Sequence, residues 1–390
     1  MSKKTVIMLG GSMQQAPVVP TLTGRGFDVI VVDRNPKAPA FNFAKTRIIA
    51  DCLDTETISQ EILAKGCEND LLAIFTLTEL VESVSKLSKR FNLPHTFLEA
   101  TQTCQNKAQS KTAWMKHSVP TPRGDQVRSI PQAIDIFKEM KTPVYAKPSI
   151  SFGGKGAQKI SSEQQLVTLL EMGIPKHGSY IIEEYIPGTM HDVNAVFSPN
   201  GNFIPLGAFD RAFLESAPME TGGIFPSQLP EHDIASLFKL TRDAALALGI
   251  HQGPVKSDIV WGSEGPKILE LAPRLHGPKG SLHLATLVQG STHVEQMLAI
   301  LQEKPLSIPP PQRTAIFKTI FPKQGQILSI KGVSDAEKSP GIDRVLLFKG
   351  VGDEVKTFEN NTHMVGYILA TGQTLQEAQK NADRATKKVH

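Results

Sequence analysis

Residues 255–274 read VKSDIVWGSEGPKILELAPR, and this stretch decides the fold. Its two β-rich runs, 255–261 and 267–272, are joined by a short turn with two glycines and a proline, which predicts a β-hairpin. With the turn centred midway between the runs, Asp258 lies opposite Glu270, and their Cβ atoms are roughly 5 Å apart. A one-residue shift in register would break this pairing.

Two carboxylates that face each other on a largely apolar hairpin repel unless a cation lies between them. The other face of the hairpin is expected to carry Ile259, Leu269 and Leu271. We interpret Asp258 and Glu270 as ligands of a magnesium or manganese ion that also binds substrate phosphates. The alternative is a solvated face on which the acids form a salt bridge with Lys256.

Arg274 follows the second strand on the same side as the two acids. Its guanidinium is suited to clamp a transferring phosphoryl group or a substrate carboxylate. A lone arginine after a strand is more often a surface residue, so this role depends on the metal pair. His276, Gly277 and Lys279 then continue the wall of the acceptor pocket, in a loop that admits an amino-acid backbone.

The chain has 390 residues, enough for two or three domains. Its 42 Lys and Arg against 38 Asp and Glu leave a net charge of +4, which suits anionic small molecules and argues against nucleic acid as a partner. Three cysteines make a sparse, odd set that indicates a reducing compartment. No apolar run approaches the about 20 residues of a spanning helix, so we expect a cytoplasmic protein without membrane contact.

The first third of the chain alternates apolar runs with helical stretches. Runs at 5–9 and 29–33 flank a glycine-containing turn and a helical segment, and a strand at 72–75 precedes apolar residues at helical spacing over 80–91. This β–α–β pattern predicts a small, doubly wound α/β domain in which the strands are buried on both faces.

A glycine-rich, basic loop follows a predicted strand at 144–148. The loop contains Gly153, Gly154, Lys155 and Gly156. It is not a Walker A loop, because its lysine is followed by glycine and not by Ser or Thr, but a flexible loop between strands can still lay backbone N–H groups over phosphates. A plain hairpin tip fits the loop equally well when it is taken alone. Lys147 favours phosphate binding, since a lysine in an apolar strand needs a partner for its charge.

Together these elements resemble the ATP-grasp superfamily of carboxylate–amine ligases over nearly the whole chain. The resemblance implies an α/β fold with a pre-ATP-grasp domain over residues 1–105 and an ATP-grasp domain over 106–312. A nucleotide-clamping lid would lie at about 120–187, and a C-terminal domain over 313–390. It also implies a central antiparallel sheet that bears the metal site.

The same resemblance assigns residues to ATP. Lys107 and Lys147 match the two family lysines that lie on the helix before the lid and in the strand before the glycine loop. The segment Glu183-Glu184-Tyr185-Ile186 is similar to the hinge strand that gives an acid and main-chain groups to adenine. His191 stands at the position of a ribose-binding residue, and a solvent-exposed or core histidine is the alternative there.

The metal signature of the family is matched in part. Three of its four residues are present, namely Asp258, Glu270 and Arg274. Ala272 replaces the asparagine that usually completes the shell of a second magnesium ion. The Glu-x-Ala-x-Arg-x-x-Gly form is similar to the amino-acid ligase and carbamoyl-phosphate-synthetase-like branches. Residues 341–353 and 366–372 are similar to the C-terminal domain of L-amino-acid ligases.

The resemblance implies that ATP phosphorylates a substrate carboxylate and that an amine attacks the resulting acyl phosphate, with release of ADP and phosphate. Catalysis is then positioning and charge neutralisation by magnesium, Lys107, Lys147 and Arg274. We expect an amino acid as the carboxylate, an amine or second amino acid as the nucleophile, and a homodimer as the assembly. Two alternatives stay open: a carboxylase or carbamoyl-phosphate-type enzyme that uses bicarbonate, and a nucleotide-binding module that has lost turnover.

Overall fold

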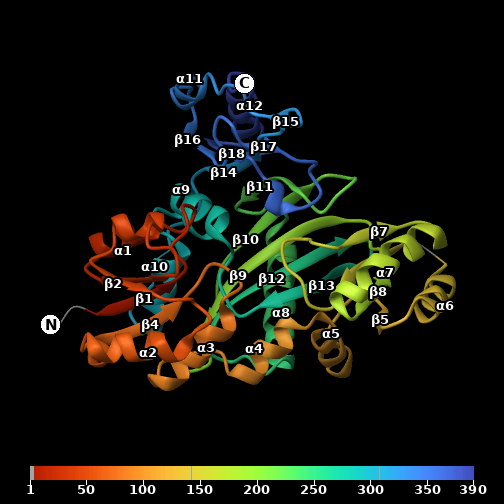
Figure 1. Ribbon diagram of the computed structural model, residues 1–390, viewed down its shortest axis with the longest axis horizontal. Helices are drawn as coiled ribbons and strands as arrows, with labels where there is room; N and C mark the ends of the chain where they lie inside the picture. Colours follow the sequence, from red (N-terminus) through yellow and green to blue (C-terminus); the bar gives the residue numbers. More distant parts are fainter. Residues whose placement is uncertain (1–3, 142, 307) are drawn as a thin grey trace.

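The computed structural model describes residues 4–141, 143–306 and 308–390. An N-terminal α/β unit lies on one side of a long antiparallel sheet, and a smaller clamp of strands and helices lies on the other side (Figure 1). The last strands of the chain extend the long sheet away from both units. The predicted mixed α/β class is confirmed.

The N-terminal unit is a four-stranded parallel sheet with helices on both faces. Its strands, in spatial order, are β3 (Thr46–Ile49), β2 (Asp28–Asp33), β1 (Thr5–Leu9) and β4 (Leu71–Phe75). Its helices are α1 (Val18–Gly24), α2 (Thr55–Ala64) and α3 (Val81–Arg90). Val6 and Met8 pack in one apolar cluster with α1, whereas Ile7 and Leu9 pack in another with α2 and α3. Neighbouring side chains of β1 are therefore buried on opposite faces, as predicted for a doubly wound sheet.

The clamp is a four-stranded antiparallel sheet with two helices of its own. Two helices lead into it, α4 (Leu98–Gln105) and α5 (Lys107–Lys116). Its strands, in spatial order, are β5 (Gly124–Val127), β8 (Tyr180–Glu184), β6 (Val144–Pro148) and β7 (Gln158–Ile160). Its helices are α6 (Ile130–Met140) and α7 (Glu163–His177). The glycine loop joins β6 to β7, so it lies at the tip of this clamp.

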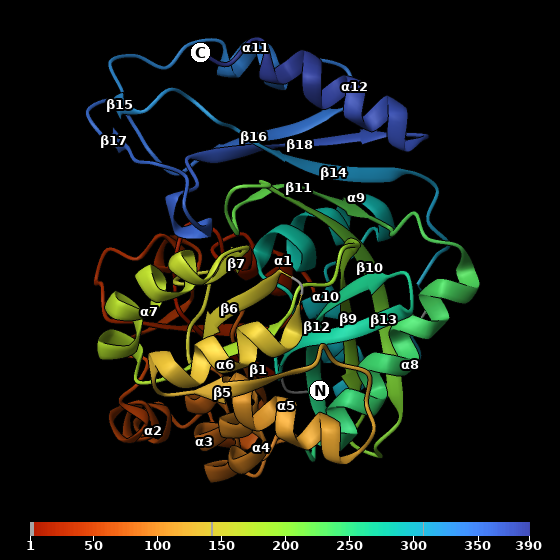
Figure 2. The same ribbon diagram turned by 90° about the vertical axis from the view of Figure 1, so that its right-hand side faces the viewer.

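The long sheet has eight strands and runs through the whole molecule (Figure 2). In spatial order these are β13 (Gly265–Ala272), β12 (Gly253–Gly262), β9 (Thr189–Phe197), β10 (Phe203–Phe213), β11 (Glu220–Phe225), β14 (Thr314–Thr319), β18 (Gly366–Gly372) and β16 (Ile342–Leu347). The last three come from the C-terminal part of the chain. Strands β14, β18 and β16 therefore continue the central sheet.

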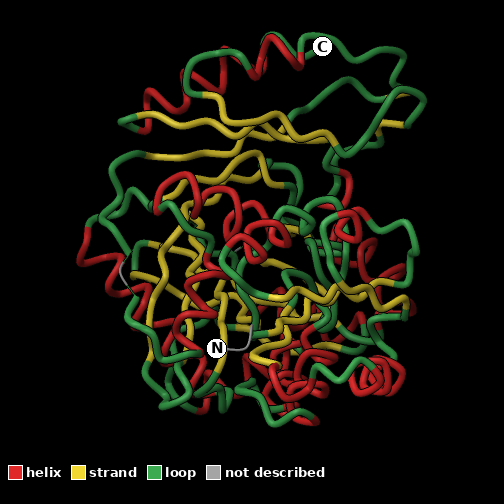
Figure 3. Tube along the Cα trace, turned by 90° about the vertical axis from the view of Figure 1, so that its left-hand side faces the viewer, coloured by secondary structure: helices red, strands yellow, loops and turns green. Residues whose placement is uncertain are grey.

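The remaining helices cover the long sheet. They are α8 (Glu231–Ala247), α9 (Ala285–Gln289), α10 (His293–Leu301), α11 (Val333–Glu337) and α12 (Leu375–Thr386). Helix α12 packs on β18 and β14 and lies along the outer side of the last strands (Figure 3). A separate two-stranded ladder pairs β15 (Gly325–Gln326) with β17 (Glu354–Val355). Within the described ranges, no helix combines the length and apolar character that crossing a bilayer requires.

The predicted hairpin forms from β12 and β13. Asp258 lies opposite Glu270, so the predicted register is confirmed. A β-bulge follows this pair and places Ile259 opposite Ile268 instead of Leu269. Ile268 is fully buried and Leu269 only half-buried, so the prediction that Leu269 lies on the core face is wrong. The extra residue of the bulge breaks the simple alternation on which that prediction depended.

Candidate active site

A cavity of about 290 Å³ lies between the tip of the clamp and the long sheet. Ser151, Phe152 and Lys155 of the glycine loop line one wall, and Glu270 and Ala272 of β13 line another. The two motifs that the sequence assigns to phosphate and metal therefore face a common space. This arrangement needs both the clamp and the central sheet, which are far apart in the sequence.

The glycine loop has a backbone that only glycine adopts easily. Gly153, Gly154 and Gly156 all have positive φ, at 66°, 79° and 72°. A Cβ on Gly154 would lie 2.9 Å from the carbonyl oxygen of Pro218, so the loop also approaches the long sheet closely. The backbone N–H of Asn361 donates to the carbonyl oxygen of Gly153 at 3.3 Å. The loop is thus held down by the C-terminal part of the chain.

Lys107 connects the glycine loop to the carboxylate strand. It is the first residue of α5, after the N-cap Asn106. Its Nζ donates to the carbonyl oxygen of Ser151 at 2.7 Å and lies 3.5 Å from Oε1 of Glu270. The structure therefore brings together Lys107, the loop and Glu270, which the sequence predicts as parts of one ATP site.

Lys147 has a protein partner for its charge. Its Nζ lies 2.6 Å from Oε1 of Glu183, and Lys111 Nζ lies 3.0 Å from Oε2 of the same carboxylate. Glu183 is 2% exposed. Burial alone would raise its pKa, but the two lysines lower it below the usual value for a glutamate. Among the described residues Glu183 is thus a partner for the charge of Lys147, and a contact between Lys147 and phosphate stays a prediction.

Sequence reasoning did not find Lys111. The available signal was its position four residues after Lys107 on a predicted helix, which places both lysines on one face. Burial lowers the pKa of Lys111, in opposition to the nearby carboxylate of Glu183. Glu183, predicted as the acid for adenine, is instead engaged on both oxygens by lysines.

The other predicted hinge and ribose residues lie at the base of the clamp. Glu184 pairs with Arg123 at 3.1 Å and with Lys267 of the hairpin at 3.2 Å. Ile186 packs so closely on the hairpin turn that a Cβ on Gly262 would lie 2.6 Å from its Cγ2. These contacts place the hinge segment beside β12 and β13.

His191 is a buried histidine with both ring nitrogens engaged. Nδ1 lies 2.8 Å from Oδ1 of Asp210, and Nε2 lies 2.7 Å from Oγ1 of Thr189. Because side chains alternate along a strand, His191 and Asp192 leave β9 on opposite faces. The ribose role of His191 is therefore not supported by its surroundings, which match the core-histidine alternative.

Three carboxylates form a row across three adjacent strands. Asp192 of β9 is in register with Asp258 of β12, which is in register with Glu270 of β13. Asp258 forms an ion pair with Lys256 and a second with Arg211, at 3.1 Å from its Nη1. The salt bridge to Lys256 that the sequence left as an alternative is therefore present.

The members of this row titrate differently. Burial and the neighbouring Asp192 raise the pKa of Asp258 to about 7. Burial opposes ionisation of Asp192 as well, but Arg211 and Lys256 hold its pKa well below the usual range.

In the described part of the chain, no three His, Cys, Asp or Glu side chains gather as a ready metal site. Glu270, which lines the cavity, fits a metal bound mainly by substrate phosphates.

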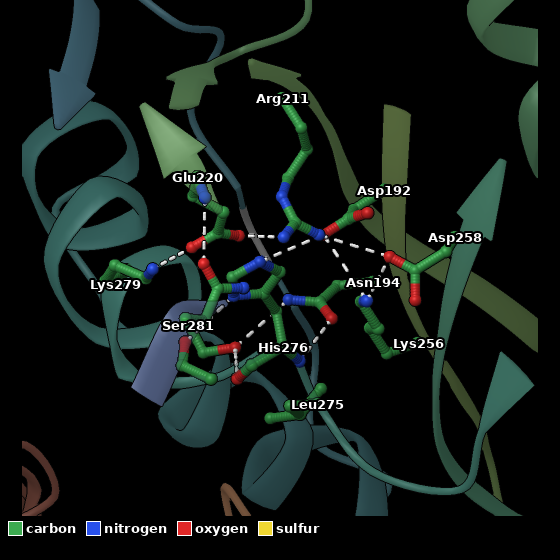
Figure 4. Close-up of polar contacts among 12 residues, drawn as sticks. Asp192, Asn194, Arg211, Glu220, Lys256, Asp258, Leu275, His276, Lys279 and Ser281 are labelled. Atoms are coloured by element: carbon green, nitrogen blue, oxygen red, sulfur yellow. Dashed lines mark hydrogen bonds and ion pairs between the residues drawn. The ribbon is translucent and has the colours of Figure 1, made fainter. Parts of the chain in front are cut away.

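A buried polar cluster continues from this row toward the C-terminal strands (Figure 4). Arg211 bridges Asp192 and Glu220, and Glu220 also pairs with Lys279. His276 lies with Nε2 3.0 Å from Oδ2 of Asp192. The cluster therefore holds acidic and basic side chains together in a buried region. Of these residues, the sequence analysis assigns only His276 and Lys279 to the site.

Asn194 holds the segment after β13 in place. Its Oδ1 accepts from the backbone N–H of His276 at 2.7 Å, and its Nδ2 lies 3.1 Å from Oγ of Ser281 and 2.8 Å from Nδ1 of His293. Gly277 lies in this segment, where a Cβ would be 3.9 Å from the carbonyl oxygen of Leu77 in the N-terminal unit. Asn194 thus anchors the predicted acceptor wall at His276, but none of His276, Gly277 and Lys279 lines the cavity.

Arg274 reaches the N-terminal unit. Its Nη2 donates to Oε1 of Glu79 at 2.6 Å, and its Nη1 donates to the carbonyl oxygen of Leu275 at 3.0 Å. Its Nε is buried and lacks a hydrogen-bond partner among the described residues. Glu79 lines the cavity beside Glu270. Arg274 thus contacts a residue of the cavity lining, whereas its own side chain lines a neighbouring pocket with Leu77 and Leu275.

Two enclosed histidines should make stability depend on pH. Burial lowers the pKa of His293 to about 3 and that of His283 to about 4, from about 6.5 in an unfolded chain. Between the low pKa values of the folded state and about 6.5, these two histidines bind more protons in the unfolded chain than in the folded one. We therefore expect the free energy of unfolding to be highest above pH 6.5 and to fall toward pH 4. Melting temperatures from pH 7.5 to 4.5 test this, and His293→Gln should flatten the decline. An unchanged slope in that variant would contradict the assignment.

Two family models match the chain in succession. The model of the ATP-grasp domain matches residues 104–278. The chain carries an ATP-grasp domain. The model of the L-amino acid ligase C-terminal domain 2 matches residues 318–390. The predicted superfamily resemblance and the ATP-grasp fold are therefore confirmed, and the matched ranges include the glycine loop, the hairpin and strands β16 and β18.

Solved structures and a curated relative are similar along most of this ATP-grasp chain. An L-amino acid ligase from Bacillus licheniformis is 19% identical, with a TM-score of 0.83 over 100% of this chain and 98% of that one. The biotin carboxylase domain of a Hydrogenobacter thermophilus 2-oxoglutarate carboxylase, solved with MgADP, ADP and bicarbonate, is 16% identical, with a TM-score of 0.74 over 100% and 91%. The uncharacterized protein y4rH of Sinorhizobium fredii is 21% identical over 87% of this chain and 72% of its own. At these identities the structural matches show the fold alone.

Proposed function

We propose that this ATP-grasp chain is an ATP-dependent ligase that forms C–N bonds between the carboxylate of an amino acid and an amine or second amino acid. The γ-phosphoryl group of ATP passes to a carboxylate oxygen and ADP leaves. The amine then attacks the carbonyl carbon, and the C–O bond to phosphate breaks. The observation that carries this proposal is the cavity lined by the glycine loop, Glu270 and Glu79. Lys107 contacts Glu270, and Arg274 contacts Glu79.

The residues of the cavity divide into a phosphate side and an acceptor side. On the phosphate side, Lys107 and Lys147 would contact ATP, and the glycine loop would cover it and exclude water. On the acceptor side, Arg274 would orient the carboxylate that accepts the phosphoryl group. No nucleophilic side chain is required, because positioning and charge neutralisation supply the catalysis.

The polar cluster favours an amino acid over bicarbonate as the acceptor. An amino acid carries an ammonium and a carboxylate, and the cluster, which lies outside the lining of the cavity, holds acids and bases that pair with one another. Asp192 and Glu220 suit the ammonium, whereas Arg211 and Lys279 suit a carboxylate. The match of residues 318–390 to an L-amino acid ligase domain supports the same substrate class.

Magnesium is implied by the ATP-grasp family, and the donor set fits one ion at the cavity. Glu270 would offer carboxylate oxygens on the cavity wall, and ATP phosphates would provide further oxygens. When bound, the ion would neutralise the phosphate charge. Manganese has the same preference for oxygen ligands. A cytoplasmic location and a homodimeric assembly stay predictions.

Product analysis tests the proposed reaction. Purified protein is incubated with ATP, magnesium and paired amino acids, with bicarbonate removed, and nucleotides are separated by chromatography. We expect ADP and orthophosphate to form only when an amino acid and an amine are both present. AMP and pyrophosphate would indicate an adenylating enzyme, and turnover that requires bicarbonate would indicate a carboxylase. Absence of ADP with every acceptor would indicate a binding module.

Lys147→Ala is expected to weaken ATP binding about 10- to 150-fold, because it removes a charge-assisted contact to phosphate of about 1.5–3 kcal/mol. The clamp should stay folded, since Glu183 keeps its pair with Lys111. Calorimetric titration with ATP measures the effect, and Lys176→Ala, on the exposed end of α7, is the matched control. An unchanged dissociation constant in Lys147→Ala would count against its role.

A further inference from the structure

Lys256 lies at the centre of the carboxylate row, although the proposed reaction assigns it no role. It is on β12 two residues before Asp258, so both side chains leave the same face of the sheet. Its Nζ forms an ion pair with Oδ1 of Asp258 and lies 3.5 Å from Oδ2 of Asp192. Lys256 is only 7% exposed, so its charge is confined to this place.

The two carboxylates of the hairpin have different surroundings. Asp258 meets two fixed cations, Lys256 and Arg211. Glu270 meets only Lys107 among the ion pairs of the described residues, at 3.5 Å, and its side chain is 37% exposed. Glu270 also lines the cavity. Two protein cations are therefore already paired with Asp258, whereas Glu270 has one such partner and faces the cavity.

The residues beside Lys256 on the two neighbouring strands are poor ligands for a metal ion. Lys256 is in register with Ala272 on β13, whose methyl side chain offers no oxygen to a metal. On the other side it is in register with Asn194, whose amide is used by His276 and Ser281. A second divalent ion beside Asp258 would face two fixed positive charges, and Ala272 offers it no oxygen on the β13 side. On the β9 side, Oδ1 of Asp192 is without a hydrogen-bond partner among the described residues.

We propose that the ammonium of Lys256 takes the place of one metal ion, so that the nucleotide-loaded chain binds a single divalent cation, at Glu270. Asp258 is then the partner of Lys256 and Arg211 and not a metal ligand. The fixed ammonium neutralises negative charge between the phosphate side and the acceptor side. This inference rests on the proposed function, since it concerns the metal that accompanies the nucleotide.

Counting bound manganese tests the inference without an activity measurement. Mn²⁺ is titrated into protein with saturating ADP, and the six-line electron paramagnetic resonance signal of free Mn²⁺ gives the number bound. Equilibrium dialysis with labelled ADP measures nucleotide binding separately. We expect one Mn²⁺ per chain in the wild type, and two in the double variant Lys256→Met with Ala272→Asn, which removes the ammonium and adds an oxygen ligand.

Lys318→Met is the matched control, because Lys318 lies in the same long sheet and pairs with the exposed Asp383 on α12. It should bind one Mn²⁺, as the wild type does. Glu270→Gln should lose at least tenfold in Mn²⁺ affinity. Two Mn²⁺ in the ADP-loaded wild type, or one in the double variant with a wild-type circular dichroism spectrum, would overturn the inference alone. Absence of ADP binding would overturn the proposed function, and this inference with it.

Discussion

Arg274→Ala is expected to lower the turnover number about 10²- to 10³-fold while its affinity for ATP stays near the wild-type value. The reason is that the guanidinium would contact the acceptor carboxylate more strongly as charge develops during phosphoryl transfer. Its ion pair with Glu79, which lines the cavity, supports this role. Initial rates of phosphate release and calorimetric ATP titration measure the two quantities.

Two further variants separate a role in catalysis from a role in domain packing. Glu79→Gln removes the ion pair between Arg274 and the N-terminal unit but keeps the guanidinium, so it should retain most turnover. Arg274→Lys should rescue little, since an ammonium cannot copy the bidentate fork of a guanidinium. If Glu79→Gln lost as much turnover as Arg274→Ala, the arginine would act through the ion pair and the predicted role would fail.

Glu183→Ala is expected to destabilise the clamp by about 3–5 kcal/mol, because it leaves Lys147 and Lys111 buried without their shared carboxylate. The loss should appear as faster hydrogen exchange in β6 and β8, which hold Lys147 and Glu183, and as a lower urea midpoint by circular dichroism. The N-terminal sheet should exchange as in the wild type.

Glu139→Ala is the control for this second prediction, because Glu139 is an exposed acid on α6 of the same clamp. Its effect should stay within about 0.5 kcal/mol. Equal hydrogen exchange in Glu183→Ala and Glu139→Ala would show that the buried triad contributes little to the clamp. A large loss of ATP affinity in Glu183→Ala with normal exchange would instead return this acid to the adenine site.

The candidate site combines predictions that depend on local pattern with contacts that do not. The register of Asp258 and Glu270 followed from strand alternation and a short turn, and the structure confirms it. The resemblance to the ATP-grasp superfamily and the α/β class are confirmed as well. The domain boundaries after residues 105 and 312, and the chemical roles of the site residues, stay predictions.

The sequence by itself determined the β–α–β unit, the hairpin and the glycine loop, because each depends on periodicity or turn chemistry within a few neighbouring residues. Only the tertiary structure decided which charges meet. Strand order places Asp192 beside Asp258, and the clamp brings Lys111 and Lys147 to one carboxylate. Such pairs lie far apart in the chain, and their geometry arises from sheet order and domain packing, which no local pattern encodes.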